Sequence, residues 1–312
     1  MDNKRRILTS PYKNAFVFEY GNLDDNTIWI LPPSQKVFNI DQFTLKVILD
    51  MNNGTKVDVI SKKYDLPMEE IQSILNKLSF ESAITEQNCG RIMMSQNNDT
   101  VDLAPLLTLS VVMLFIQIEY FRNVAHTFIM NSFADSMIVA IIAIAVVFFH
   151  ELGHYLACIK HFKPRFGFMF VSIFPTIYVN TNLSWTLSKS IRIFINLSGA
   201  FADLIVNTVL VFMVVLFPKV EYFITPLLML QYSRLLIVLN PLLPGDGYWI
   251  LSDVLNKVNL KQKSLRELLS FRFNFMSFFG LVSFIMMVVP MIFFGIYIFN
   301  LIYSFIQKLG LL

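Results

Sequence analysis

The chain has 312 residues, of which 55% are hydrophobic and 15% are charged, and its formal net charge is +3. An ordinary soluble domain has about 25% charged residues. The shortage of charge, together with several apolar runs long enough to cross a bilayer, excludes an ordinary soluble protein and predicts an integral membrane protein. The two cysteines, Cys89 and Cys158, lie far apart, which argues against a disulfide framework and fits a reducing compartment.

The N-terminal region contains short apolar runs separated by turn residues, a pattern typical of a small soluble domain. Asp41 lies where it can cap a helix, and Asn53 with Gly54 predicts a turn after that helix. The predicted strands are 15–20, 27–31, 36–40 and a short return at 82–84, and the predicted helices are 43–51, 56–64 and 67–79.

This order of strands and helices resembles the PqqD-like winged-helix domain, which captures leader peptides of ribosomally made, modified peptides. The resemblance implies a small α+β domain at 13–85, after a tail at 1–12, that docks a precursor peptide. A generic winged helix would instead bind DNA. Residues 41–81 carry a net negative charge, however, which matches phosphate poorly, so we expect no nucleic-acid partner. A merely structural domain is the remaining alternative.

A polar stretch at 86–102 predicts a linker, and the domain from 103 to 312 then consists largely of apolar runs. Four of these runs are near the length of about 20 residues that a bilayer requires. They lie at 103–121, 136–158, 193–217 and 223–243. A fifth run, 271–306, is too long for one span, and Pro290 near its middle predicts a helical hairpin or one kinked helix. We expect about six transmembrane helices.

Basic residues predict the orientation of these helices. They gather after the second run (Lys160, Lys163, Arg165, Lys189, Arg192) and after the fourth (Lys257, Lys261, Lys263, Arg266, Arg272). Loops rich in lysine and arginine face the cytoplasm. No signal-peptide core follows the charged N-terminus. We therefore expect a multi-pass protein of the cell membrane whose N-terminal domain is cytoplasmic.

The sequence His150-Glu151-Leu152-Gly153-His154 closes the second apolar run. Residues four apart share one face of a helix, so His150 and His154 can bind one Zn²⁺. Glu151 lies one step round the helix, where its carboxylate can take a proton from a metal-bound water. The alternative is an accidental match on a structural helix.

Zinc needs a third protein ligand, and Asp246 is the strongest candidate. It lies in Asn240-Pro241-Leu242-Leu243-Pro244-Gly245-Asp246-Gly247-Tyr248, where the prolines and glycines break the fourth span. A carboxylate at membrane depth is a functional hypothesis by default. The alternative is a turn that leaves the bilayer with Asp246 in solvent. Cys158 shares the helix face of the histidines but lies about 6 Å further along the axis, so we expect it to be a buried apolar residue.

These two motifs resemble the site-2 protease family of intramembrane zinc metallopeptidases, and the Asn-Pro…Asp-Gly-Tyr form resembles its peptide-maturation branch. The resemblance implies that His150, His154 and Asp246 bind one Zn²⁺ per chain and that Glu151 is the general base. It also implies that Asn240 contacts substrate or the oxyanion.

Between the second and third spans, residues 166–179 are rich in aromatic and β-branched residues and include Gly167 and Pro175. This composition predicts an extended segment at the membrane edge. The family resemblance implies that this segment clamps an extended substrate, whereas a connecting hairpin without that role is the alternative.

We expect a membrane zinc endopeptidase that matures a ribosomally made precursor peptide, with a peptide-modifying enzyme or an exporter as further partners. One alternative is regulated intramembrane cleavage of a single-span protein such as an anti-sigma factor. Another is a non-catalytic membrane protein for peptide export or immunity, although such a protein would not need Glu151.

Overall fold

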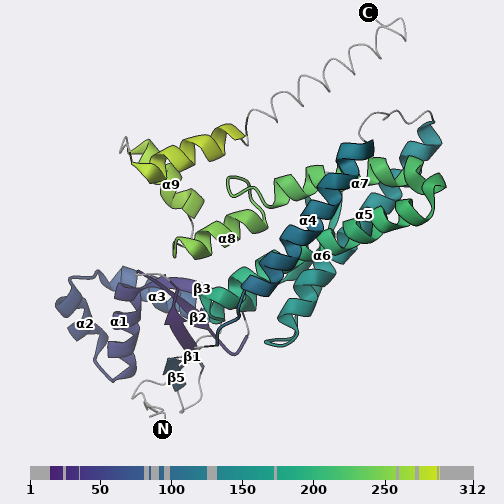
Figure 1. The fold of residues 1–312 in the computed structure, drawn as a ribbon. Coiled ribbons are helices and arrows are strands. Elements are labelled where there is room, and N and C mark those ends of the chain that lie inside the picture. The colour runs from purple at the N-terminus through teal and green to yellow at the C-terminus, as the bar shows by residue number, and fades with distance from the viewer. Residues whose placement is uncertain are drawn as a thin grey trace, which may run out of the picture. The chain divides into compact units, whose positions relative to one another are not determined.

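The computed structural model describes residues 15–23, 26–34, 36–80, 84–85, 91–94, 99–124, 132–171, 174–257, 260–270, 274–286 and 288 (Figure 1). The chain divides into two compact units, Met1–Leu227 and Leu228–Leu312. The first unit contains a small sheet with its helices and the long apolar helices. The second unit begins within the seventh helix and contains the expected zinc ligand Asp246.

The N-terminal part of the first unit is built on one five-stranded sheet. Its strands are β1 (Ala15–Asn22), β2 (Thr27–Leu31), β3 (Phe38–Asp41), β4 (Ile84–Thr85) and β5 (Arg91–Met94). The order β3-β2-β1-β4 is antiparallel throughout, while β5 pairs with β1 in parallel. The sequence predicted the first four strands within one or two residues, with β4 shifted to 84–85.

Three helices follow β3 in the chain, as predicted: α1 (Gln42–Asn52), α2 (Val57–Tyr64) and α3 (Met68–Phe80). Asp41 caps α1, because its Oδ1 accepts a hydrogen bond of 2.7 Å from the backbone N–H of Thr44. The sheet and the helices share one apolar core, in which the completely buried side chains are Ile30, Val47, Ile48, Ile60 and Ile71. This part of the chain therefore has a core of its own.

The expected linker at 86–102 contains a strand. Residues of β5 pair with β1 from Val17 to Tyr20, beyond the short contact that β4 makes with Ala15 and Phe16. β5 reads Arg-Ile-Met-Met, a short apolar step inside an otherwise polar stretch, and its pairing partner β1 lies some 70 residues earlier in the chain, so the local sequence alone does not identify it as a strand. The N-terminal sheet therefore extends to Met94, nine residues beyond the boundary predicted at 85, while the limits of a separate N-terminal domain stay a prediction.

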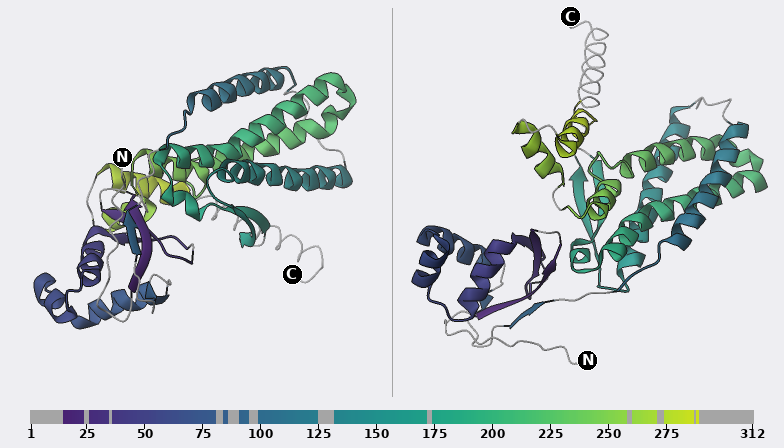
Figure 2. Two further views of the ribbon diagram at one scale, coloured as in Figure 1. Left: turned by 90° about the horizontal axis from the view of Figure 1, so that it is seen from below. Right: turned by 60° about the vertical axis from the view of Figure 1, so that its left-hand side comes forward.

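In the part of the chain that the structure describes, three helices are long and apolar enough to cross a membrane: α4 (Ala104–Val124), α5 (Phe133–Cys158) and α6 (Lys189–Leu216). They match the first three predicted spans. Helix α6 packs against both α4 and α5 (Figures 1 and 2). Apolar side chains such as Phe115, Ile144 and Leu216 remain exposed on their outer faces, as expected for helices surrounded by lipid. These helices indicate a membrane protein.

The later predicted spans differ from the structure. Helix α7 (Glu221–Val238) contains Pro226 and ends five residues before the predicted limit at 243. It is not one of the three described helices that are long and apolar enough to cross a membrane. In the last predicted region, a shorter apolar helix covers Phe275–Met286, while Pro290 and the residues after it lie outside the described part. Six spans thus stay a prediction.

Polar side chains hold α4 against α6. The amide Nε2 of Gln117 donates to the backbone oxygen of Leu204 at 2.9 Å and to Oγ1 of Thr208 at 2.7 Å. Because lipid offers no hydrogen-bond partners, such contacts between helices help fix how α4 and α6 meet. Helix α6 in turn contacts His150 and His154 of α5.

The segment between α5 and α6 is the hairpin of β6 (Arg165–Val171) and β7 (Phe174–Asn180), paired in register from Arg165 with Asn180 to Val171 with Phe174. The extended segment predicted at 166–179 is therefore confirmed. The ring of Phe166 stacks on Tyr155 and on Phe148 of α5, with centroids 5.0 and 5.9 Å apart. These contacts seat the hairpin on α5. The short 3₁₀ helix η1 (Asn182–Thr186) then leads to α6.

The second unit contains the end of α7, then α8 (Asp246–Val254), α9 (Leu260–Leu269) and the helix Phe275–Met286. Tyr248, Leu260 and Phe279 form its buried apolar cluster. The phenol oxygen of Tyr248 also accepts a hydrogen bond of 3.1 Å from the backbone N–H of Lys261. The start of α8 is thus fixed against α9.

Candidate metal centre

Helix α5 presents two different faces near its C-terminal end. His150 and His154, one turn apart, are both buried and lie toward α6. Phe148 and Tyr155 lie toward the hairpin instead. The 3.6-residue period of the helix places Glu151 between these two faces. The two candidate metal ligands therefore lie on one face of α5, and the candidate base Glu151 lies on the adjoining face.

Helix α6 holds the Nδ1 atom of each imidazole. Nδ1 of His150 lies 2.8 Å from Oδ2 of Asp203, and Nδ1 of His154 lies 2.8 Å from the backbone oxygen of Ile195. A carbonyl oxygen and a carboxylate can only accept, so both Nδ1 atoms carry the proton. In neutral histidines, each Nε2 then presents a lone pair.

The two Nε2 atoms face one another at 3.2 Å. Two lone pairs at this distance repel unless a proton or a cation lies between them. Two nitrogens that bind one tetrahedral Zn²⁺ at about 2.0–2.1 Å are themselves about 3.3 Å apart. The imidazole pair therefore has the spacing that a shared metal ion requires.

Gly199 of α6 makes room for this pair. A Cβ added to Gly199 would lie 2.4 Å from Nε2 of His154 and 2.7 Å from Nε2 of His150. Gly153, within the motif, allows the helices to meet, because a Cβ there would lie 2.4 Å from the backbone oxygen of Ser198. The space beside both Nε2 atoms thus depends on the absence of one side chain on α6.

Glu151 is half-buried, and its Oε2 accepts a hydrogen bond of 2.8 Å from the backbone N–H of Val179 on β7. The hairpin therefore fixes the orientation of the carboxylate that the sequence assigned as general base. A carboxylate accepts hydrogen bonds through both oxygens, so this contact still leaves an oxygen able to take a proton.

Asp246 is the first residue of α8. A hydrogen bond of Asn240 and two glycines, Gly245 and Gly247, stabilise or permit the turn around it. The side-chain oxygen of Asn240 accepts from the backbone N–H of Leu242 at 2.9 Å, which begins the turn. Added Cβ atoms at Gly245 and Gly247 would lie 2.8 Å from the backbone oxygen of Val238 and 2.1 Å from that of Leu239. Both glycines thus let the start of α8 approach the end of α7.

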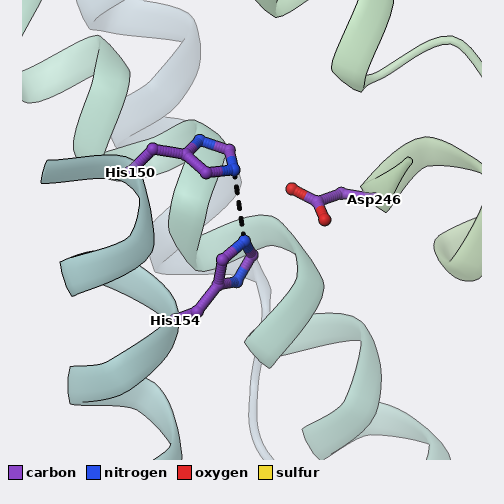
Figure 3. A group of neighbouring side chains, drawn as sticks. All are labelled: His150, His154 and Asp246. Carbon is purple, nitrogen blue, oxygen red and sulfur yellow. Dashed lines mark hydrogen bonds between the residues drawn. The ribbon is translucent and has the colours of Figure 1, made fainter. Parts of the chain in front are cut away.

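His150, His154 and Asp246 form a group in which one ligand atom from each residue lies within 4.8 Å of the others (Figure 3). The three residues are those expected to bind the metal. Two imidazoles and one carboxylate form a donor set that suits Zn²⁺ and leaves a coordination position for water. The residues present therefore fit a zinc ion.

The other residues that the sequence raised lie elsewhere. Cys158 is completely buried beside Ala157, Ile191 and Ile195, so it is the apolar residue that we expected. Asn240 serves the turn described above, and its contact with substrate stays a prediction. Cys89 lies outside the described residues.

Asp203 and Gly199 were not singled out from the sequence. Asp203 did carry a signal, since it is an acid within the predicted span 193–217, and such residues are rarely placed in a membrane without a role. Gly199 carried none, because glycine is common in membrane helices. Its importance depends on which helix packs against it.

Comparison with known proteins gives one informative similarity. Over 120 residues, 37% of this chain, the sequence is 35% identical to a Bacillus subtilis (strain 168) protein named "Putative peptide zinc metalloprotease protein YydH". The match covers 46% of that protein, so the chain spans about half the length of the relative that it resembles. No protein-family model matches the chain, and no solved structure matches it. The similarity supports a zinc metallopeptidase, in agreement with the donor set.

Proposed function

We propose that this protein is a membrane-embedded zinc endopeptidase of the site-2 protease type that cleaves a ribosomally made precursor peptide. The observation that carries the proposal is the pair of Nε2 atoms, 3.2 Å apart, with both Nδ1 atoms held by α6. Two neutral rings that both carry their proton on Nδ1 cannot hydrogen-bond to each other through Nε2, and a cation between them accounts for the spacing. The pair lies on a helix long and apolar enough to span a bilayer, which supports hydrolysis at membrane depth.

The residues of the chain divide the chemistry between them. His150, His154 and Asp246 would hold the ion, which when bound polarises the scissile carbonyl and acidifies a water molecule. Glu151 takes the proton of the attacking water on a carboxylate oxygen and delivers it to the nitrogen of the leaving peptide. The N–H of Val179 keeps that carboxylate in position during both transfers.

A peptide substrate is supported by two features. The relative from Bacillus subtilis is named as a peptide zinc metalloprotease. The chain also has a separate N-terminal α+β core of the kind that, by its resemblance to PqqD-like domains, captures precursor peptides. That domain would deliver the peptide from the cytoplasm to the zinc centre.

Zinc content tests the assignment of Asp246. We expect about one Zn²⁺ per chain in the detergent-purified protein and a large loss of zinc in Asp246→Ala, because two imidazoles alone bind the ion weakly. Elemental analysis of both proteins after dialysis measures this loss.

Glu119→Gln is a suitable control, because Glu119 is an acid on the apolar helix α4 that pairs with Arg122 and is half-exposed. It should keep the ion. Full zinc occupancy in Asp246→Ala would refute its assignment as a ligand. If the wild-type protein, folded and supplied with metal, contains no zinc, a non-catalytic peptide-binding membrane protein becomes the better description.

Removal of the N-terminal domain tests the docking role. Because β5 completes the sheet, the deletion must include it, and we choose residues 1–98. We expect the affinity for the precursor to fall by about tenfold or more while zinc content stays the same. The precursor is identified from peptides that the wild type converts and Glu151→Gln does not, and its binding is measured by fluorescence anisotropy. Unchanged affinity would exclude the docking role.

A further inference from the structure

Asp203 is a completely buried carboxylate on α6, one of the three helices apolar enough to span a membrane. A carboxylate is costly to bury at such a position unless a partner compensates its charge. Its Oδ2 lies 2.8 Å from Nδ1 of His150, itself buried. The buried carboxylate therefore contacts His150 at Nδ1, on the side of the ring opposite to Nε2.

The two histidines differ in what holds them. The Nδ1–H of His154 donates to a neutral backbone oxygen, that of Ile195, whereas the Nδ1–H of His150 donates to a carboxylate. Both acceptors fix the tautomer that leaves Nε2 ready to bind a cation. A carboxylate acceptor also raises the basicity of the imidazole and so strengthens its Nε2 as a metal ligand. A neutral backbone oxygen has a weaker effect of the same kind.

Asp203 belongs to a row of residues on α6. Ile195, Gly199 and Asp203 follow one another at intervals of four, so they share one face of the helix. The first holds Nδ1 of His154, the second lies against both Nε2 atoms, and the third holds Nδ1 of His150. This face of α6 thus contacts both imidazole rings and fixes their orientation.

We propose that Asp203 is the positioning residue for His150: it holds the ring with Nδ1 protonated and Nε2 directed at the metal. The inference rests on the proposed function, since it requires that the imidazole pair bind a metal ion. It gives α6 a part in zinc binding although α6 supplies no zinc ligand.

The test compares the zinc affinity of Asp203→Ala, Asp203→Asn and the wild type, by competition with a chromophoric chelator in detergent. Removing the partner of a metal-bound histidine costs about 10- to 100-fold in metal affinity, and we expect a loss of that size in Asp203→Ala. Asp203→Asn should bind zinc with an intermediate affinity, because its amide oxygen can still accept the Nδ1 proton but carries no charge.

Asn207 provides the matched control, one turn further along the same face of α6 and equally buried. Neither polar atom of its side chain has a hydrogen-bond partner among the described residues, so Asn207→Leu removes no such contact. It should bind zinc as the wild type does. Thermal unfolding of each metal-free variant separates a change in folding from a change in the site.

Each result decides a different question. Wild-type zinc affinity in Asp203→Ala would overturn the positioning role while leaving the zinc peptidase intact. Equal losses in Asp203→Ala and Asn207→Leu would also overturn it, since they would indicate a general effect of α6 packing. Absence of zinc from the wild type would refute the proposed function itself, and this inference with it.

Discussion

Gly199→Ala should weaken zinc binding severely without removing any of the proposed ligands. The added Cβ would lie within 2.4–2.7 Å of the two imidazoles, so the rings must turn away or α6 must move back. We expect zinc affinity to fall by about 100-fold or more, since even the loss of a supporting contact costs 10- to 100-fold. Chelator competition on the purified variant measures the affinity, and peptide cleavage should fall with it.

Val209→Ala is the control for this prediction. Val209 lies on the same helix but is more than half exposed, on a surface where the apolar side chains face outward. It should bind zinc normally. If Gly199→Ala binds zinc as tightly as the wild type, the ion does not lie beside the two Nε2 atoms, and the site must be elsewhere.

Glu151→Gln should have the opposite effect, keeping zinc while losing turnover. The amide oxygen of glutamine can still accept the hydrogen bond from Val179, but it cannot take a proton from water. We expect cleavage to slow by about 10³-fold, within the range for the loss of a general base. Mass spectrometry of the precursor and elemental analysis of the same preparation measure the two properties together.

A comparison with His154→Ala separates metal binding from proton transfer within the His150–His154 motif. That variant removes a proposed zinc ligand, so it should lose both zinc and cleavage. Cleavage by Glu151→Gln at the wild-type rate would mean that another group accepts the proton. Loss of zinc from Glu151→Gln would instead make Glu151 part of the metal-binding set.

The parts of the site that follow from local rules could be predicted from sequence. The helical period alone places His150 and His154 on one face, and Glu151 follows from its place between them. Asp246 was singled out because prolines and glycines mark a break in a helix at membrane depth, and the structure groups it with the two histidines. In the same way, alternating apolar residues and turn residues located the first strands and helices of the N-terminal domain.

The parts that depend on distant segments could not be predicted. Gly199 and Asp203 act on α5 from positions some 45 to 53 residues later in the chain, and only the packing of α6 on α5 reveals their roles. Strand β5 was missed for the same reason, since its partner is β1. The end of α7 at Val238, by contrast, lies next to the Asn240-Pro241 break that the sequence shows, although the apolar run continues to 243.

The hydrogen bond from Val179 to Glu151 affects how inactive variants should be interpreted. Since a backbone amide of β7 holds Glu151, the proposed base, any substitution that shifts the hairpin also shifts that carboxylate. Such a variant would keep its full zinc content and yet be inactive, as Glu151→Gln is expected to be. Phe166, which stacks on α5, is one position where this can occur. An inactive, zinc-loaded phenotype therefore reports the state of the hairpin as well as that of the glutamate.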